Sequence, residues 1–162
     1  MSLTELSIQL PNRPGALVRV ARILAKEQIN LAAISVDSTR TRGRVRLVVS
    51  DPSRGRRLLE EAGYAVESHD LLAVRLEDRA GSFLRVLEAL ATANVNVSSV
   101  AILVAREGTQ TLVAISTDDL PRTRKVLRQG GFIADGAERL ITNADLLAAA
   151  PAIPSESVGL LL

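Results

Sequence analysis

The sequence predicts an α+β fold made of two βαββαβ units, each with two helices over one face of an antiparallel sheet. Two observations support this fold class. Apolar residues alternate with polar ones in some segments and recur at helical spacing in others, in the order strand, helix, strand, strand, helix, strand. That order occurs twice, and residues 12–34 and 78–100 are identical at seven of 23 positions without a gap. We therefore interpret the chain as an internal duplication of a ferredoxin-like unit.

The first unit is defined by its turn residues and by the period of its apolar residues. Strict alternation predicts a strand, and Pro11 ends it because proline cannot donate to a strand ladder. Asp51 and Pro52 are typical of a helix start, and Gly63 of a helix end. Within residues 29–37 the phase of the alternation shifts, which a β-bulge or a late strand start would explain. The predicted elements are strand 3–10, helix 16–26, strands 29–37 and 44–49, helix 52–62 and strand 64–68.

The second unit repeats this order in residues 71–141. Its elements are strand 72–76, a helix beginning near Phe83, a hairpin of residues 95–104 and 111–116, helix 119–129 and a closing strand. We expect a first domain at 1–69, a second at 70–142, and a short helical turn with a flexible tail at 143–162. Because no linker separates the units, their sheets should lie side by side or be continuous, as one rigid body.

Composition excludes several classes of function. Hydrophobic residues make up 47% of the 162 residues, enough for a packed core, and charged residues 23%. The net charge of +2 and the 2% of aromatic residues do not favour a nucleic-acid partner. With no cysteine, disulfides, thiolate catalysis and cysteine zinc sites are excluded. The start lacks a signal-peptide pattern and no apolar run is long enough to span a bilayer, so we expect a cytoplasmic protein without a membrane partner.

Arginines gather in two places, at Arg40, Arg42, Arg44 and Arg46, and at Arg54, Arg56 and Arg57. Such runs are either solvated faces of strands and helices or an anion-attracting patch.

The sequence does not favour an enzyme. His69 is the only histidine, so histidine-pair metal sites and two-histidine mechanisms are excluded. Ser35, Ser98 and Ser99 have no nearby base to activate them. No Walker or dinucleotide motif is present, and we expect no cofactor. Acylphosphatases share this topology and use a loop arginine with an asparagine, so an acylphosphatase-like hydrolase around Arg13 is a further alternative, although their glycine-rich loop is absent.

The candidate binding site is the turn Asn12-Arg13-Pro14-Gly15-Ala16-Leu17. The backbone N–H groups of Gly15, Ala16 and Leu17 would be unpaired donors at a helix N-terminus, where a carboxylate fits. The amides of Asn12 and Asn30 can both donate and accept, which suits a ligand with an ammonium and a carboxylate group. The alternative is that these residues only form a turn and a cap.

The second copy of the turn is Asp78-Arg79-Ala80-Gly81-Ser82-Phe83, and it is not equivalent to the first. Asp78 replaces Asn12 and adds a negative charge, Ala80 replaces Pro14, and Asn96 is retained. We therefore expect the first turn to be the better site.

Residues 6–36 resemble an ACT domain, the small regulatory module named after aspartate kinase, chorismate mutase and prephenate dehydrogenase. The resemblance lies in Leu-Pro-Asn-Arg-Pro-Gly-Ala-Leu, the helix to Lys26 and Gln-Ile-Asn-Leu-Ala at 28–32, and residues 71–104 resemble a second, more divergent ACT domain. It implies paired domains that bind amino acids at a domain interface. Leu10 and Leu76 stand where some serine-binding members have a histidine. The implied ligand-binding residues are Asn12, Arg13, Pro14, Gly15, Ala16, Leu17, Asn30, Asp78, Arg79, Gly81, Ser82, Phe83 and Asn96.

The resemblance implies a non-catalytic, allosteric regulatory protein that binds an amino acid and forms a homodimer. The alternative is an interaction module that controls an enzyme or a transcription factor without a ligand.

Overall fold

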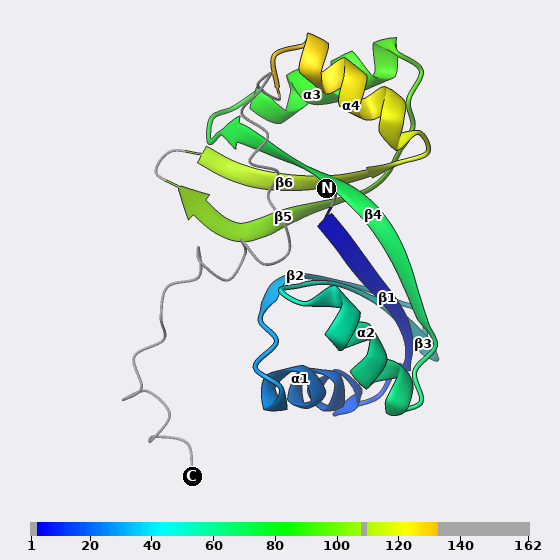
Figure 1. The fold of residues 1–162 in the computed structure, drawn as a ribbon. Helices are drawn as coiled ribbons and strands as arrows, with labels where there is room; N and C mark the ends of the chain where they lie inside the picture. Colours follow the sequence, from blue (N-terminus) through cyan, green and yellow to red (C-terminus); the bar gives the residue numbers. More distant parts are fainter. Residues whose placement is uncertain (1–2, 108–109, 133–162) are drawn as a thin grey trace.

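The structure of the chain, a computed structural model, describes residues 3–107 and 110–132 (Figure 1). These residues follow the predicted order of strands and helices from β1 to α4, which confirms the α+β fold class. The elements are β1 (Leu3–Pro11), α1 (Ala16–Lys26), β2 (Leu31–Ser38), β3 (Arg42–Val49), α2 (Pro52–Glu61), β4 (Val66–Glu77), α3 (Ser82–Thr92), β5 (Val97–Glu107), β6 (Gln110–Thr117) and α4 (Leu120–Gln129). The closing strand, the helical turn and the tail expected after α4 lie outside the described residues.

The strands form one antiparallel sheet in the order β2-β3-β1-β4-β6-β5. The strands expected at 64–68 and 72–76 are one strand, β4. Its first half pairs with β1, from Val66 to Leu71, and its second half pairs with β6, from Leu72 to Glu77. The sheet is therefore continuous through β4 (Figure 1). The division at residues 69 and 70 falls inside this strand and stays a prediction.

The shift of apolar phase within residues 29–37 has a structural cause, and the second unit has the same irregularity. The pairing of β2 with β3 changes register between Leu31 and Ala33, and that of β5 with β6 changes between Val97 and Ser99. The strands also begin later than predicted, at Leu31 and Val97. An irregularity at the same place in both units is expected of a duplicated fold.

Each pair of helices covers one face of its half of the sheet. Val20 and Leu24 of α1 and Leu59 of α2 pack with buried residues of β1 and β3. Val86 and Leu90 of α3 pack with Leu127 of α4 and with buried residues of β4 and β6. Both α2 and α4 begin at an aspartate whose side chain accepts a hydrogen bond from the backbone, as the sequence predicts for Asp51.

A third apolar cluster joins the two units on the faces that carry no helix. Figure 1 shows α1 and α2 on one outer side, α3 and α4 on the other, and the strands between them. The end strands β2 and β5 contact each other, so the sheet is folded over on itself. The cluster consists of Leu3, Ala32, Ala33, Val48, Leu71, Leu103, Leu112 and Ala114. The units are thus joined by a shared strand and by buried apolar contacts.

Candidate functional site

The two predicted turns have the same backbone geometry. Gly15 and Gly81 precede α1 and α3 with φ values of 83° and 84°. This left-handed conformation favours glycine, which explains why glycine occupies both positions. The amides of Ala16 and Ser82 donate to the carbonyls of Arg13 and Arg79, both at 3.2 Å. The expectation of three unpaired donors at the first turn is therefore wrong for Ala16, since the turn itself uses that amide.

Asn12 ties the first turn to the β2–β3 hairpin. Its Nδ2 donates to the carbonyl of Thr39 at 2.8 Å, and its backbone N–H donates to the carbonyl of Thr41 at 3.0 Å. The side chain is exposed, and the hydrogen bonds fix its position. A ligand at this turn would therefore find an amide that is already oriented.

Asn30 and Asn96 hold the start of an edge strand against the end of its partner. The backbone N–H of Asn30 donates to Ser50 Oγ at 3.0 Å, and its carbonyl accepts from the Ser50 N–H at 3.0 Å. Asn96 makes the same pair of bonds with Asp118. The Asn30 side chain accepts from the N–H of Leu31. The backbone at this position thus has the same structural role in both units, and the Asn30 side chain adds a local bond in the first.

The structure does not bring Asn12 and Asn30 together within one unit. Asn12 precedes α1 and Asn30 follows it, and this helix of 11 residues is about 16 Å long at 1.5 Å per residue. One amino acid cannot contact both side chains. A site that used both would need each asparagine from a different unit or a different copy of the chain.

The second turn borders a cavity of about 200 Å³ at the N-terminus of α3. Four of the predicted residues line it, namely Asp78, Arg79, Ser82 and Phe83. Sequence reasoning missed the remaining lining residues, which come from three strands: Leu76, Glu77, Val100, Ile102, Thr111 and Val113. The alternation along β4, β5 and β6 places all of them except Glu77 on the helix face of the sheet, but only the folded structure sets them beside the turn.

Ser82 is an unusual residue of this cavity. Its side chain is 4% exposed, and its Oγ has no hydrogen-bond partner. A buried hydroxyl without a partner costs about 1–3 kcal/mol. The equivalent residue of the first unit is Ala16, which has no hydroxyl. The unpaired group therefore distinguishes the second turn from the first.

The cavity is bordered by groups of opposite charge and by apolar side chains. The positive end of the α3 dipole favours an anion, and so do the N–H groups of its first turn other than that of Ser82, since no helical carbonyl can accept from them. Asp78 lies at the rim and is exposed, while Arg79 forms an ion pair with Glu77. The strands supply an apolar wall that includes Val100 and Ile102. The cavity thus offers donors, an acceptor carboxylate and apolar surface.

Other kinds of site find little support in the part of the chain that the structure describes. Within residues 3–107 and 110–132 no three His, Asp or Glu side chains lie together in a way that could hold a metal ion. His69 lies 3.6 Å from Glu67, on the exposed part of β4. None of the four described helices is long and apolar enough to cross a membrane.

Comparison with known proteins assigns the chain to a family. A search of curated proteins finds no match. A solved structure of a protein from Bacteroides thetaiotaomicron is similar, with 27% identity, a TM-score of 0.79, and coverage of 90% of this chain and 96% of that one. The ligand-free regulatory subunit of aspartate kinase from Thermus thermophilus shares the fold, with 17% identity, a TM-score of 0.61, and coverage of 80% and 91%. Residues 1–141 match the sequence profile of the ACT domain pair. The chain therefore belongs to the ACT domain pair family.

Proposed function

We propose that this chain is a non-catalytic regulatory protein that binds a free amino acid with an apolar side chain at the second turn. The observation that carries the proposal is the buried, unpaired Ser82 hydroxyl beside the cavity at the N-terminus of α3. A ligand carboxylate would accept from this hydroxyl and from the first-turn N–H groups that follow Ser82. Asp78 would accept from the ligand ammonium.

The size and the lining of the cavity favour a small ligand. Its volume of about 200 Å³ lies below the roughly 300–1,000 Å³ of pockets for drug-sized molecules. Val100, Ile102 and Val113 would contact the ligand side chain and favour an apolar one. This differs from the first turn, which the sequence favours through Asn12 and Asn30, and the two turns can be tested separately.

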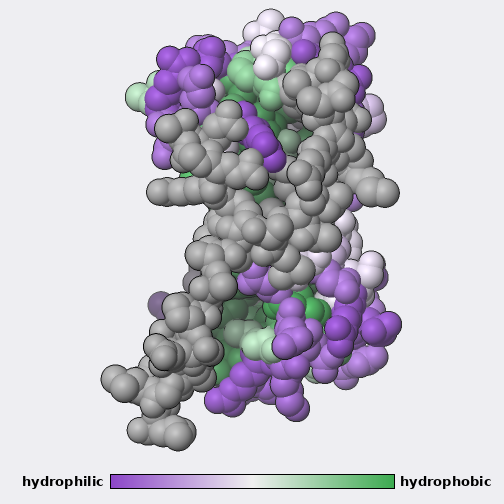
Figure 2. All heavy atoms as spheres, turned by 60° about the vertical axis from the view of Figure 1, so that its left-hand side comes forward, coloured by the Kyte–Doolittle hydropathy of each residue, from purple (hydrophilic) through white to green (hydrophobic). Residues whose placement is uncertain are grey.

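We further propose that the protein acts as a homodimer and that the second copy closes this cavity. The exposed large apolar residues are Leu17, Val18, Ile34 and Val36 in the first unit, and Leu84, Val100 and Ile102 in the second. Val18, Ile34 and Val36 are at the positions equivalent to Leu84, Val100 and Ile102. Figure 2 shows hydrophobic surface in both units, framed by hydrophilic residues. Ile102 is 69% exposed and lines the cavity. Covering it would bury apolar surface and would couple ligand binding to assembly.

The test is thermal or chemical denaturation of the full chain in the presence of each of the twenty amino acids. A specific ligand at 100 times its Kd raises the free energy of unfolding by about 2.7 kcal/mol. We expect an apolar amino acid to act in this way, and its effect to be lost in Asp78→Asn and kept in Asn12→Ala. The opposite pattern would move the site to the first turn. No effect from any amino acid would reject the proposal.

A second candidate function is regulation of an enzyme to which this chain binds. Its support is that the similar Thermus thermophilus structure is a regulatory subunit of aspartate kinase, together with the exposed apolar positions above. At 17% identity that likeness establishes only the fold. An unchanged monomer at all protein concentrations, with one stoichiometric enzyme recovered from cell extract, would favour this function over a homodimer.

A further inference from the structure

The two arginine clusters of the sequence have different environments in the structure. In the second cluster, on α2, each of the three arginines has an acidic neighbour. Arg54 pairs with Glu27, Arg56 with Glu60 at 2.8 Å, and Arg57 lies 3.9 Å from Glu61. That cluster is a solvated helix face with its charges balanced.

Three of the four arginines of the first cluster lie on β3, and their charges are not balanced in this way. Arg42, Arg44 and Arg46 alternate with Gly43, Val45 and Leu47. Because Val45 and Leu47 belong to the core beneath α1 and α2, the three arginines share the opposite, helix-free face of the sheet. Arg46 forms an ion pair with Asp37 of β2. Among the residues that the structure describes, the guanidinium groups of Arg42 and Arg44 have no acidic partner.

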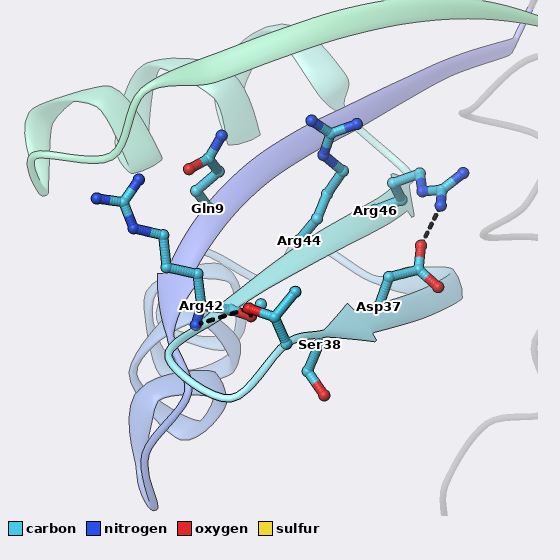
Figure 3. Close-up of a pocket in the computed structure, with 8 residues that line it drawn as sticks. Gln9, Asp37, Ser38, Arg42, Arg44 and Arg46 are labelled. Carbon is cyan, nitrogen blue, oxygen red and sulfur yellow. Dashed lines mark hydrogen bonds and ion pairs between the residues drawn. The ribbon is translucent and has the colours of Figure 1, made fainter.

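These arginines line a cavity of about 410 Å³ (Figure 3). Gln9, Arg44 and Asp37 lie directly across from one another on β1, β3 and β2. The remaining lining residues include Ser38, at the end of β2, and Thr39 of the β2–β3 turn. In Figure 3 the side chains of Gln9, Arg42 and Arg44 extend on the same side of the strands, and Arg46 reaches toward Asp37. Among the described residues, three arginines and one aspartate thus line this cavity.

Arg46 adds an unsatisfied donor. Its Nε is buried and has no hydrogen-bond acceptor, although another nitrogen of the same group pairs with Asp37. A buried donor without an acceptor is destabilising, and donors of this kind are normally satisfied by protein, water or ligand. The cavity is therefore lined by two guanidinium groups without an acidic partner among the described residues, those of Arg42 and Arg44, and by one donor without an acceptor, the Nε of Arg46.

We propose that this cavity binds a phosphate-bearing small molecule, at a site separate from the turn of the proposed function. Guanidinium groups recognise phosphate oxygens with paired hydrogen bonds. A phosphate group carries a charge of about −1.5 to −2 at pH 7, which matches the two unpaired arginines, whereas a single carboxylate would leave one unmatched. Arg42 and Arg44 are two residues apart on one strand, about 7 Å, so two linked phosphates can engage both.

The ligand extends beyond its phosphate groups. The cavity volume lies within the roughly 300–1,000 Å³ range of small-molecule pockets. A second cavity of about 250 Å³ shares Gln9 and Arg44 with it and is lined by Tyr64 and Glu67. Glu67 disfavours a further anion there, so the uncharged part of the ligand would lie toward Tyr64.

The experiment is calorimetric titration of the full chain with inorganic pyrophosphate, and separately with malonate as a carboxylate of similar span. We expect pyrophosphate to bind and malonate to bind at least tenfold more weakly. Arg44→Gln and Arg42→Gln should each weaken pyrophosphate binding at least tenfold. The matched control is Arg19→Gln, which removes an equal charge from the exposed side of α1. It should change the affinity less than twofold.

Three outcomes would overturn the proposal. They are no pyrophosphate binding at millimolar concentration, equal binding of malonate, or an equal loss in Arg19→Gln and Arg44→Gln, which would show attraction to net charge alone. Arg42 and Arg44 are exposed, so both variants should fold, and circular dichroism checks this. The amino acid of the proposed function would bind at the second turn, away from this cavity. A negative result with pyrophosphate would therefore not bear on the proposed function.

Discussion

Replacing Ser82 by alanine is expected to stabilise the ligand-free protein and to weaken amino-acid binding. The Oγ atom is buried without a partner in the structure, and such a group costs about 1–3 kcal/mol. Alanine keeps the apolar packing of the side chain, and it occupies the same place at the start of α1, as Ala16. We therefore expect the free energy of unfolding to rise by about 1 kcal/mol in Ser82→Ala.

Ser50→Ala is the matched control for this substitution. Ser50 is also buried, but its Oγ accepts from the backbone N–H of Asn30 at 3.0 Å. Its loss leaves that N–H unpaired, so we expect a destabilisation of about 1–3 kcal/mol. The same chemical change should thus have opposite signs at the two positions.

The assay is urea denaturation followed by circular dichroism, with and without the amino acid that stabilises the wild type. The midpoint of Ser82→Ala should rise without ligand, with an unchanged slope, and the ligand-induced shift should fall. A destabilisation of Ser82→Ala comparable to that of Ser50→Ala would refute the reasoning. It would mean that the Ser82 hydroxyl is already satisfied in the ligand-free protein.

Three further predictions concern the sheet and its faces. Burial raises the pKa of the Glu5 carboxyl above its ordinary value of 4.5, against the opposing charges of Arg46 and His69. Its stabilising contribution is therefore complete below pH 4.5 and is lost as the pH rises through the raised pKa. Glu5→Gln should remove this fall in the free energy of unfolding, as denaturation measured from pH 4 to 8 would show. An equal fall in the variant would contradict the assignment. Leu71→Ala, in the cluster between the units, should lower the free energy of unfolding by about 2–5 kcal/mol and lower the midpoint of a single unfolding transition. Two separate unfolding transitions in the wild type would show that the units are not coupled. Ile102→Lys should shift sedimentation toward the monomer, and an unchanged dimer would move the interface away from β5.

Much of the fold was predictable because its signals are local. The alternation in β1, the aspartate caps of α2 and α4, and the glycines that require positive φ depend on residues that are neighbours in the sequence. The duplication was visible for the same reason, since Gly15 and Gly81 need the same backbone conformation. The resemblance to ACT domains rested on these short segments, and it is confirmed by the family match over residues 1–141.

The candidate sites were less predictable because they depend on residues from distant strands. Asn12 and Asn30 are similar in chemistry, but α1 holds them apart, and Asn30 bonds to Ser50 across the sheet. The cavity at the second turn needs Val100 and Ile102, whose exposure depends on the edge position of β5.

The sequence by itself determined which segments form strands, helices and turns, and that the chain contains the same unit twice, because periodicity and turn chemistry act over a few residues. Only the tertiary structure decided that β4 serves both units and that their helix-free faces meet. It also decided that the arginines of β3 line a cavity while those of α2 are paired. These outcomes depend on which charges and apolar surfaces the fold brings within a few ångströms of one another, and the spacing of residues along the chain does not specify that.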